Sequence, residues 1–244
     1  MPPPLHPAPA DEALDPATPL ARGSAVLTAA SQLGAGDEHA AWARQTGVAG
    51  VVLAAGSGTR LGLPKALLRL PDGRPLGRVT AQRLHQAGCS RVLVVVGARA
   101  DEVVATLPTH EPWLRVAVAK GWSHGLGHSL RRGLDELEGT SASAALVALV
   151  DLPDLGVDVY RRVLGYAAPT TDVLARAAYR GFPGHPVVIG RDYWPSTRAV
   201  ACGDRGARDL LAQRRHDMVE CGDLATGRDV DTPADRARLR TTGR

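Results

Sequence analysis

Lysine, cysteine and aromatic side chains are all scarce in this chain of 244 residues. Only Lys65 and Lys120 are lysines, and all the other Lys and Arg positions are arginines, which draws attention to where those two lysines fall. The three cysteines, Cys89, Cys202 and Cys221, form no C-x-x-C spacing. An odd number of cysteines without metal-ligand spacing argues against a disulfide framework or a zinc site, and it predicts reduced thiols in a cytoplasmic protein.

Aromatic residues make up 4% of the chain, and its 29 Lys and Arg residues are spread without a dense basic run. Single-stranded nucleic acid is bound on aromatic side chains within basic grooves. These two absences therefore argue against a nucleic-acid partner, despite the net charge of +4. No apolar run approaches the roughly 18 residues that span a bilayer. The first residues also lack the early basic side chain and the apolar segment of a signal peptide, so we expect no membrane partner.

Residues 1–46 differ in composition from the rest of the chain. Seven prolines fall within the first 19 residues, and proline removes backbone donors and disfavours helix. Little in this segment is able to fill a core. We predict a disordered Pro/Ala-rich tail over 1–46 and one folded domain over 47–244. Removal of the tail is expected to leave folding and activity nearly unchanged.

From Gly47 onward, strand and helix patterns alternate. Residues 91–97 (RVLVVVG) and 144–150 (AALVALV) are continuous apolar runs, typical of parallel strands buried on both faces. Such alternation predicts an open, mostly parallel α/β sheet with flanking helices. Residues 173–179 and 185–190 predict an antiparallel pair inserted late in this sheet. The other predicted elements are strands at 48–55, 114–118, 217–220 and 228–230, and helices at 75–87, from 101, at 129–137, near 192–200, near 204–214 and from 233.

A glycine-rich loop follows the first predicted strand directly. Glycines at 56, 58 and 62 allow backbone N–H groups to turn toward an anion without obstruction by Cβ atoms. Arg60 adds a fork of donors suited to phosphate, and Lys65 adds a compact charge. A Walker loop requires lysine directly after its last glycine, whereas Leu63 and Pro64 intervene here. A Rossmann fingerprint and a kinase loop both require a small residue where Leu61 stands.

Carboxylates gather after two of the predicted strands. Asp151 falls just beyond the carboxyl end of the 144–150 strand, the edge at which open α/β sheets bind ligands. A carboxylate there is suited to hold Mg²⁺ against a phosphate, whereas Asp154 fits a helix cap better. Asp229 and Asp231 are two apart on an extended segment, so both side chains face one way. Asp235 follows a helix start at Pro233 and is predicted to be structural.

Six sequence blocks follow one another along the chain. They are LAAGSGTRLGLPK at 53–65, G-x-x-x-S-L-R-x-G-L at 125–134, D-x-P at 151–153, G-H-P at 184–186, G-D-x-G-A-R at 203–208 and D-x-D-T-P-x-D at 229–235. In these blocks the chain resembles the molybdopterin nucleotidyltransferases, and within them the molybdenum cofactor cytidylyltransferases, over residues 48–240. The pair Ala54–Ala55 is similar to the cytidylyl form of the loop. Leu61 replaces a usual methionine, and His128 stands where a small hydroxyl residue is common.

This resemblance implies a Rossmann-like, GT-A-type nucleotidyltransferase that uses Mg²⁺. The implied reaction transfers CMP from CTP to the terminal phosphate of the molybdenum–pterin cofactor and releases pyrophosphate. Arg60 and Lys65 are then catalytic, and Asp151 and Asp231 hold the metal. The implied binding residues are Leu53, Ala54, Ala55, Gly56, Gly58 and Ser129 for the nucleotide, and His185, Asp204 and Arg208 for the acceptor. The implied partners are CTP or another nucleoside triphosphate, molybdopterin, and a molybdoenzyme or its maturation chaperone.

The residues leave three other functions open. The same chemistry on a sugar phosphate or polyol phosphate is the nearest, because only the resemblance favours the pterin. An NAD(P)-dependent oxidoreductase is a second, which Leu61 and the lack of a suitably placed acid after a second strand both disfavour. A nucleotide-binding regulator without catalysis is the third, which the intact acidic blocks disfavour.

Overall fold

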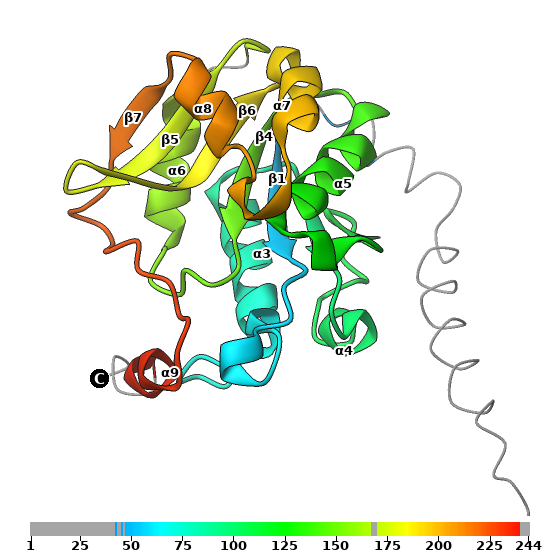
Figure 1. Ribbon diagram of the computed structural model, residues 1–244, viewed down its shortest axis with the longest axis vertical. Coiled ribbons are helices and arrows are strands. Elements are labelled where there is room, and N and C mark those ends of the chain that lie inside the picture. Colours follow the sequence, from blue (N-terminus) through cyan, green and yellow to red (C-terminus); the bar gives the residue numbers. More distant parts are fainter. Residues whose placement is uncertain (1–41, 43–44, 46, 167–169, 240–244) are drawn as a thin grey trace, which may run out of the picture. The chain divides into compact units, whose positions relative to one another are not determined.

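A computed structural model describes Trp42, Gln45 and residues 47–166 and 170–239 (Figure 1). Apart from Trp42 and Gln45, the predicted tail over 1–46 lies outside these residues, as does the end of the predicted domain, 240–244. The described ranges contain a single seven-stranded sheet in the order β3-β2-β1-β4-β6-β5-β7. The strands are β1 (Gly47–Ala54), β2 (Arg91–Val96), β3 (Leu114–Val118), β4 (Ala142–Leu149), β5 (Leu174–Tyr179), β6 (Phe182–Gly190) and β7 (Asp217–Glu220).

Parallel pairing dominates the sheet. Strands β3, β2, β1 and β4 are mutually parallel, whereas β6 runs antiparallel to both β4 and β5. The predicted fold class, an open and mostly parallel sheet with a late antiparallel insertion, is therefore confirmed. The prediction of a strand at 228–230 is wrong. This segment joins no strand, although the Val230 N–H donates to the carbonyl of Asp151 at 3.0 Å.

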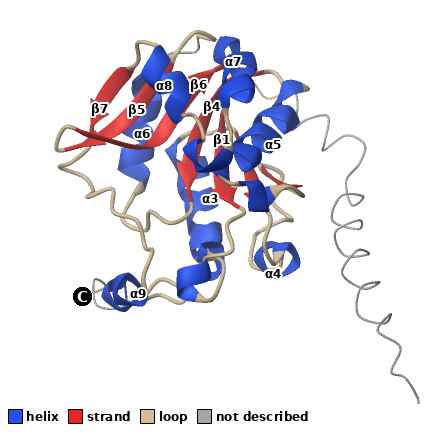
Figure 2. Cartoon of the chain, viewed as in Figure 1, coloured by secondary structure: helices blue, strands red, loops and turns tan. Residues whose placement is uncertain are grey.

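Helices cover both faces of the sheet (Figure 2). Consecutive residues of β1 face opposite sides of the sheet and contact different helices. A Cβ atom at Gly50 would lie 3.2 Å from Leu84 of α3, and Val51 lies against Gly133 of α5. The helices are α3 (Leu76–Ala87), α4 (Ala100–Val104), α5 (Leu126–Glu138), α6 (Val157–Tyr166), α7 (Trp194–Val200), α8 (Arg208–Gln213) and α9 (Pro233–Leu239). None of the helices in the described ranges is long and apolar enough to cross a membrane.

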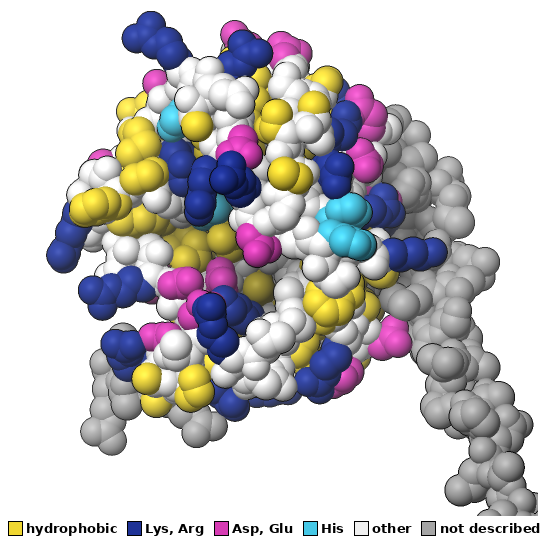
Figure 3. All heavy atoms as spheres, in the orientation of Figure 1, with side chains coloured by type: hydrophobic (Ala, Val, Ile, Leu, Met, Phe, Trp, Pro, Cys, Tyr) yellow, Lys and Arg dark blue, Asp and Glu magenta, His cyan; other side chains and the backbone are white. Residues whose placement is uncertain are grey.

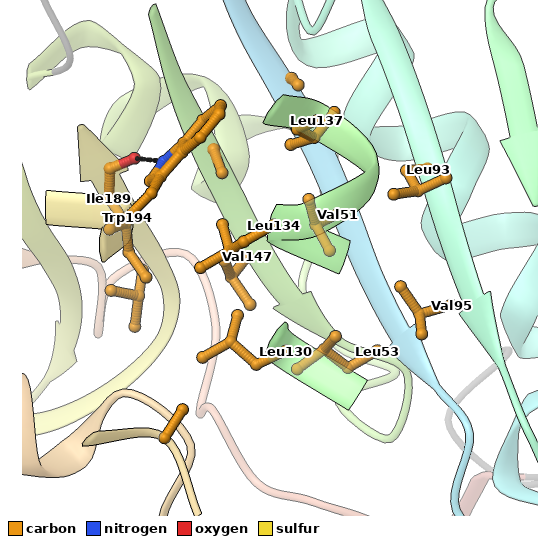
Figure 4. Close-up of a cluster of buried hydrophobic side chains, with 14 of the residues drawn as sticks. Val51, Leu53, Leu93, Val95, Leu130, Leu134, Leu137, Val147, Ile189 and Trp194 are labelled. Carbon is orange, nitrogen blue, oxygen red and sulfur yellow. Dashed lines mark hydrogen bonds between the residues drawn. The ribbon is translucent and has the colours of Figure 1, made fainter. Parts of the chain in front are cut away.

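The main apolar cluster lies between the sheet and α5 (Figure 4). Leu130, Leu134 and Leu137 recur at helical spacing and turn one face of α5 toward the strands. Each buried leucine of this kind contributes about 1.5–3 kcal/mol relative to an exposed one. Trp194 closes the cluster from α7, and its indole N–H donates to the carbonyl of Ile189 at 3.0 Å. The cluster thus holds α5 and α7 on one face of the sheet.

Trp42 corrects the predicted boundary between tail and domain. Its side chain is 2% exposed and belongs to the same apolar cluster. The indole N–H donates to the carbonyl of Trp113 at 3.2 Å, and the Arg91 guanidinium lies 5.3 Å from the ring centroid. The folded region therefore includes residue 42. A proline-rich composition concealed this one anchoring side chain.

We predict that Trp42→Ala lowers the free energy of unfolding by about 3–5 kcal/mol, because it leaves a cavity where a large side chain was buried. Truncation of residues 1–46 removes the same indole and is expected to destabilise the protein by a similar amount. Chemical denaturation monitored by circular dichroism measures both effects. The matched control is Phe182→Ala, since Phe182 is 76% exposed and its loss should change stability little. Equal stability of Trp42→Ala and wild type would show that the indole anchors nothing.

Candidate functional site

The glycine-rich loop leaves β1 and closes on itself. Gly58 has a φ of 61°, and a Cβ atom there would lie 2.0 Å from the carbonyl oxygen of Leu63, so only glycine fits. Gly62, with a φ of 72°, ends the short helical turn that begins at Thr59. This turn exposes Arg60, while the chain turns back so that Lys65 opens a second short turn. The loop geometry thereby holds both cationic side chains at the carboxyl end of β1.

Three carboxylates meet beside this loop. Asp151 follows the end of β4, and its carbonyl accepts the N–H of Val230, which brings the 229–231 segment alongside. One oxygen from each of Asp151, Asp229 and Asp231 lies within 4.8 Å of the other two. This is the only group of three or more such ligand side chains within the part of the chain that the structure describes. The resemblance implied that either Asp229 or Asp231 completes a metal site, with Asp231 favoured, and the structure brings both of them to Asp151.

Lys65 joins the loop to the acidic cluster. Its ammonium donates to Asp151 Oδ2 at 2.7 Å and also to Asp231 Oδ1, and Arg60 Nη1 donates to Asp231 Oδ2 at 2.6 Å. Burial alone lowers the pKa of Lys65, but the charges and hydrogen bonds of Asp151 and Asp231 outweigh it and raise the pKa above its ordinary value. The hydrogen bond from Lys65 lowers the pKa of Asp231 in turn. Lys65 and Asp231 are therefore both charged at neutral pH.

The acidic cluster has the chemistry of a divalent-cation site. The side chain of Asp151 is 17% exposed, and its buried Oδ1 has no hydrogen-bond partner among the described residues. A buried carboxylate oxygen without a partner is costly, and a cation bound at that oxygen would satisfy it. Carboxylate oxygens are the ligands that Mg²⁺ and similar hard cations prefer. The residues present thus fit a divalent metal ion held by Asp151 with Asp231, Asp229 or both.

Neighbouring polar groups fix the two acidic segments. Arg83 of α3 donates to the carbonyls of Pro153 and Leu155 at 2.8 and 3.0 Å, directly after Asp151. The prediction that Asp154 caps a helix is wrong, because its Oδ2 accepts both the N–H and the hydroxyl of Thr226 at 2.7 and 2.6 Å. Asp154 therefore ties the segment that leads to Asp229 and Asp231 back to the loop after β4.

The start of α9 fixes Asp231 from the other side. Asp235 Oδ2 accepts the N–H and the hydroxyl of Thr232 at 2.8 and 2.6 Å, and it also accepts the N–H of Asp231 at 3.2 Å. In return, the hydroxyl of Thr232 accepts the N–H of Asp235 at 3.2 Å. This reciprocal cap agrees with the predicted structural role of Asp235, and its hydrogen bonds hold the pKa of that carboxyl far below its usual range.

A second wall of the site comes from the β5–β6 hairpin. Gly184 packs against the ring of Tyr179, since a Cβ atom there would lie 2.6 Å from that ring. The hydroxyl of Tyr179 donates to the carbonyl of His185 at 2.6 Å. Gly227 packs on the same ring, two residues before Asp229, so one tyrosine joins the hairpin to the acidic segment. Burial, with the charges of Arg176 and Arg208, lowers the pKa of His185 to about 4, so its imidazole is neutral at neutral pH.

The 203–208 block packs on the first turn of α5. A Cβ atom at Gly125 would lie 2.4 Å from the carbonyl carbon of Gly203 and 2.8 Å from Asp204 Oδ1, so two of the six blocks touch. Arg208 begins α8, and both Asp204 and Arg208 are exposed. The space-filling view shows a hollow across this face of the molecule, with acidic and basic side chains gathered around it (Figure 3).

The predicted nucleotide-binding residues fall into two groups. The side chains of Leu53, Ala54, Ala55 and Ser129 are all buried, Ser129 being 3% exposed. Any contact of these four with a nucleotide is therefore through the backbone. Gly56, by contrast, is exposed in the loop. Sequence reasoning missed Arg83 and Arg176, because neither lies in one of the six blocks.

Residues 50–219 match the family described as MobA-like NTP transferase domain. The chain belongs to this family. A curated relative, nicotine blue oxidoreductase of Paenarthrobacter nicotinovorans, is 39% identical over 202 residues, which cover 79% of this chain and 96% of that protein. A probable molybdenum cofactor guanylyltransferase of Mycobacterium ulcerans is 31% identical over 194 residues, covering 77% of this chain and 90% of that protein. The MobA-like chain is thus a nucleotidyltransferase-family enzyme.

Solved structures with the same fold include mycobacterial proteins. An Rv0371c homologue from Mycobacterium sp. strain JC1 superposes with a TM-score of 0.67 at 26% identity, covering 80% of this chain and 96% of that chain. Rv0371c of Mycobacterium tuberculosis H37Rv, in complex with manganese, superposes with a TM-score of 0.63 at 27% identity, covering 80% and 98%. A member of this fold therefore binds a divalent cation.

The acidic cluster predicts a measurable cation affinity. We expect the protein to bind Mn²⁺ saturably, as followed by electron paramagnetic resonance, and Asp151→Asn to weaken this binding about tenfold or more, because one ligand charge is lost. Asp158→Asn is the matched control, since this exposed aspartate of α6 pairs with Arg161 away from the cluster. Unchanged Mn²⁺ affinity in a folded Asp151→Asn variant would contradict the assignment.

Proposed function

We propose that this protein transfers CMP from CTP to the terminal phosphate of the molybdenum–pterin cofactor and releases pyrophosphate. The observation that carries the proposal is the contact of Lys65 with Asp151 and Asp231 beside a glycine-rich loop. Phosphate chemistry needs positive charge held close to a carboxylate-bound cation, and this contact places the ammonium beside the carboxylates that would hold the cation. The resemblance of the 184–186 and 203–208 blocks supports the pterin as acceptor.

In the proposed reaction, an ionised oxygen of the acceptor phosphate attacks the α-phosphorus of CTP. A new P–O bond forms as the bond to the β-phosphate oxygen breaks, and pyrophosphate leaves with the electron pair. The attacking oxygen needs no base, which agrees with a neutral His185 of low pKa in the acceptor wall. A Mg²⁺ ion held by Asp151 and Asp231 would supply charge neutralisation at the phosphates.

Side chains and backbone groups of the protein bind the phosphates and stabilise the charge that develops on them. Arg60 and the N–H groups of the loop bind the outer phosphates, which become the leaving pyrophosphate. Lys65, a compact cation, stabilises the charge that grows at the α-phosphate. Because the loop is closed by Gly58 before substrate arrives, these donors are preorganised, and catalysis depends on positioning rather than on a covalent intermediate.

Fewer observations support the identity of the nucleobase and of the acceptor. The Ala54–Ala55 pair, similar to the cytidylyl form of the loop, favours CTP, whereas one relative is named as a guanylyltransferase. A second candidate function, reduction with NAD(P)H, is supported by the 39% identical relative named as an oxidoreductase. The acidic cluster beside Lys65 favours phosphate transfer instead, because a carboxylate-bound cation is suited to neutralise the charge of phosphates.

An activity screen separates these functions. We predict pyrophosphate release with CTP and molybdopterin in the presence of Mg²⁺, less with GTP, and none without a phosphorylated acceptor. Coupled colorimetric detection of pyrophosphate measures this across CTP, GTP and ATP and across molybdopterin, sugar phosphates and polyol phosphates. Oxidation of NADH or NADPH with nicotine blue is the parallel arm. Turnover in that arm, without pyrophosphate release in any other, would replace the proposal by the oxidoreductase function.

Lys65→Ala tests the role of the ammonium. We predict that it lowers kcat by roughly 10²–10³, because a preorganised charge is removed from the transition state. Affinity for CTP should fall less, since Arg60 and the loop amides remain. Lys65→Arg should restore little activity, because a planar fork does not reproduce a compact charge. Steady-state kinetics measures all three, with Lys120→Ala, the other lysine of the chain, as the matched control. Near-normal turnover of Lys65→Ala would show that Lys65 is not catalytic and that the loop has only a structural role.

A further inference from the structure

A pocket of about 280 Å³ lies between the tip of the β5–β6 hairpin and the segment that leads to the acidic cluster. Arg180 and Phe182 line it from the hairpin, and Arg228 lines it from the segment, directly before Asp229. Figure 1 shows both walls at one edge of the molecule, where the chain runs from β7 toward α9. None of the residues assigned above to the phosphates, the metal or the acceptor lines this pocket.

Phe182 is held at the surface of this pocket. It is the only phenylalanine of the chain, and its side chain is 76% exposed. It follows the two-residue turn Arg180–Gly181, whose φ angles of 55° and 79° both lie in the left-handed region. The carboxylate of Glu220 fixes this turn by accepting the N–H groups of Arg180 and Gly181 at 2.8 and 2.9 Å. An anchored turn therefore presents the aromatic ring.

The opposite wall of the pocket is anchored as well. Arg162 of α6 donates to the carbonyl of Glu220 and to the carboxylate of Asp223, both at 2.9 Å. Further along this wall, Asp154 accepts the two hydrogen bonds of Thr226 described above. Because side chains from outside hold both walls, the pocket is formed before a ligand binds, as most ligand pockets are.

Arg180 and Arg228 give the pocket a positive charge. Neither guanidinium forms an ion pair with an acidic side chain in the described ranges, whereas Arg162 pairs with Asp223. Arginine is also an unfavourable residue at position 180, because a two-residue turn of this conformation favours asparagine there. An exposed aromatic ring flanked by guanidinium groups suits a flat ligand with negative charge, which stacks on the ring and accepts charged hydrogen bonds.

We propose that this pocket binds a planar heteroaromatic ring that carries an anionic group. The ring stacks on Phe182, and Arg180 and Arg228 bind the anionic group. The volume lies just below that of pockets for drug-sized ligands, about 300–1,000 Å³, which suits one or two fused rings. Two sources supply this chemistry. One is the ring system of the acceptor in the proposed reaction, since Arg228 adjoins the acidic cluster, and the other is a separate small ligand.

Pterin-6-carboxylate is the probe, because it is a fluorescent, planar bicyclic ring with one carboxylate. We expect its fluorescence anisotropy to rise saturably with the concentration of the full-length protein. Cyclohexanecarboxylate has the same charge without a flat ring, so it should not displace the probe. Unsubstituted pterin lacks the carboxylate and should bind about tenfold more weakly. These titrations contain no nucleotide, so their failure is separate from failure of the transfer assay.

Four variants locate the probe in the pocket. Phe182→Ala should weaken binding about tenfold or more, as expected for loss of a stacking platform, and Phe182→Trp should restore it. Arg228→Gln should weaken binding about tenfold. Arg180→Asn should weaken it similarly while the melting temperature stays equal or rises, because asparagine tolerates the left-handed conformation. Met218→Ala is the matched control, since it removes an exposed apolar side chain of β7 outside the pocket.

The transfer assay then distinguishes the two sources of the ring. A KM for the acceptor that Phe182→Ala raises, at unchanged KM for CTP, would assign the ring to the acceptor. An unchanged KM for the acceptor would assign the pocket to a separate ligand. Absence of saturable probe binding, displacement of the probe by cyclohexanecarboxylate, or equal affinity of Phe182→Ala and wild type would overturn the site.

Discussion

The contact between the Lys65 ammonium and two carboxylates holds together three segments that are far apart in the sequence. The loop after β1, the turn after β4 and the segment before α9 meet at this cation, which Asp151 and Asp231 share. Carboxylates this close repel each other unless a positive charge lies between them. The site therefore requires a cation at this point, supplied by Lys65, by a metal ion or by both.

The surrounding residues fix the positions of Lys65, Asp151 and Asp231. Gly58 closes the loop that delivers Lys65, Arg83 holds the backbone after Asp151, and the cap at Asp235 holds Asp231. Tyr179 extends the same framework to the β5–β6 hairpin, since Gly227 packs on its ring and its hydroxyl donates to the carbonyl of His185. A rigid frame of this kind suits catalysis by positioning, because the charged groups need not reorganise when substrate binds.

The fold was largely readable from the sequence, because continuous apolar runs such as 91–97 and 144–150 have few alternatives to buried parallel strands. The sequence predicted a site where glycines and charges stand in blocks, and the structure brings Gly58, Lys65 and Asp151 of these blocks together. The strand predicted at 228–230 is absent, because an extended segment forms a strand only beside a partner strand, and the local sequence does not show whether a partner is present. Trp42 and Arg176 were missed for a related reason. Each is a single side chain whose role depends on contacts with distant residues.

We propose that a nucleoside triphosphate and its cation are bound and activated where Lys65 meets Asp151 and Asp231. A crystal structure of the protein with Mg²⁺ and α,β-methylene-CTP, which cannot release pyrophosphate, would show whether they bind there. We predict electron density for a cation on the carboxylates of Asp151 and Asp231, outer phosphates on the glycine loop, and the Lys65 ammonium turned toward the α-phosphate. A triphosphate bound elsewhere, with Lys65 still bridging both carboxylates and no cation between them, would contradict the account.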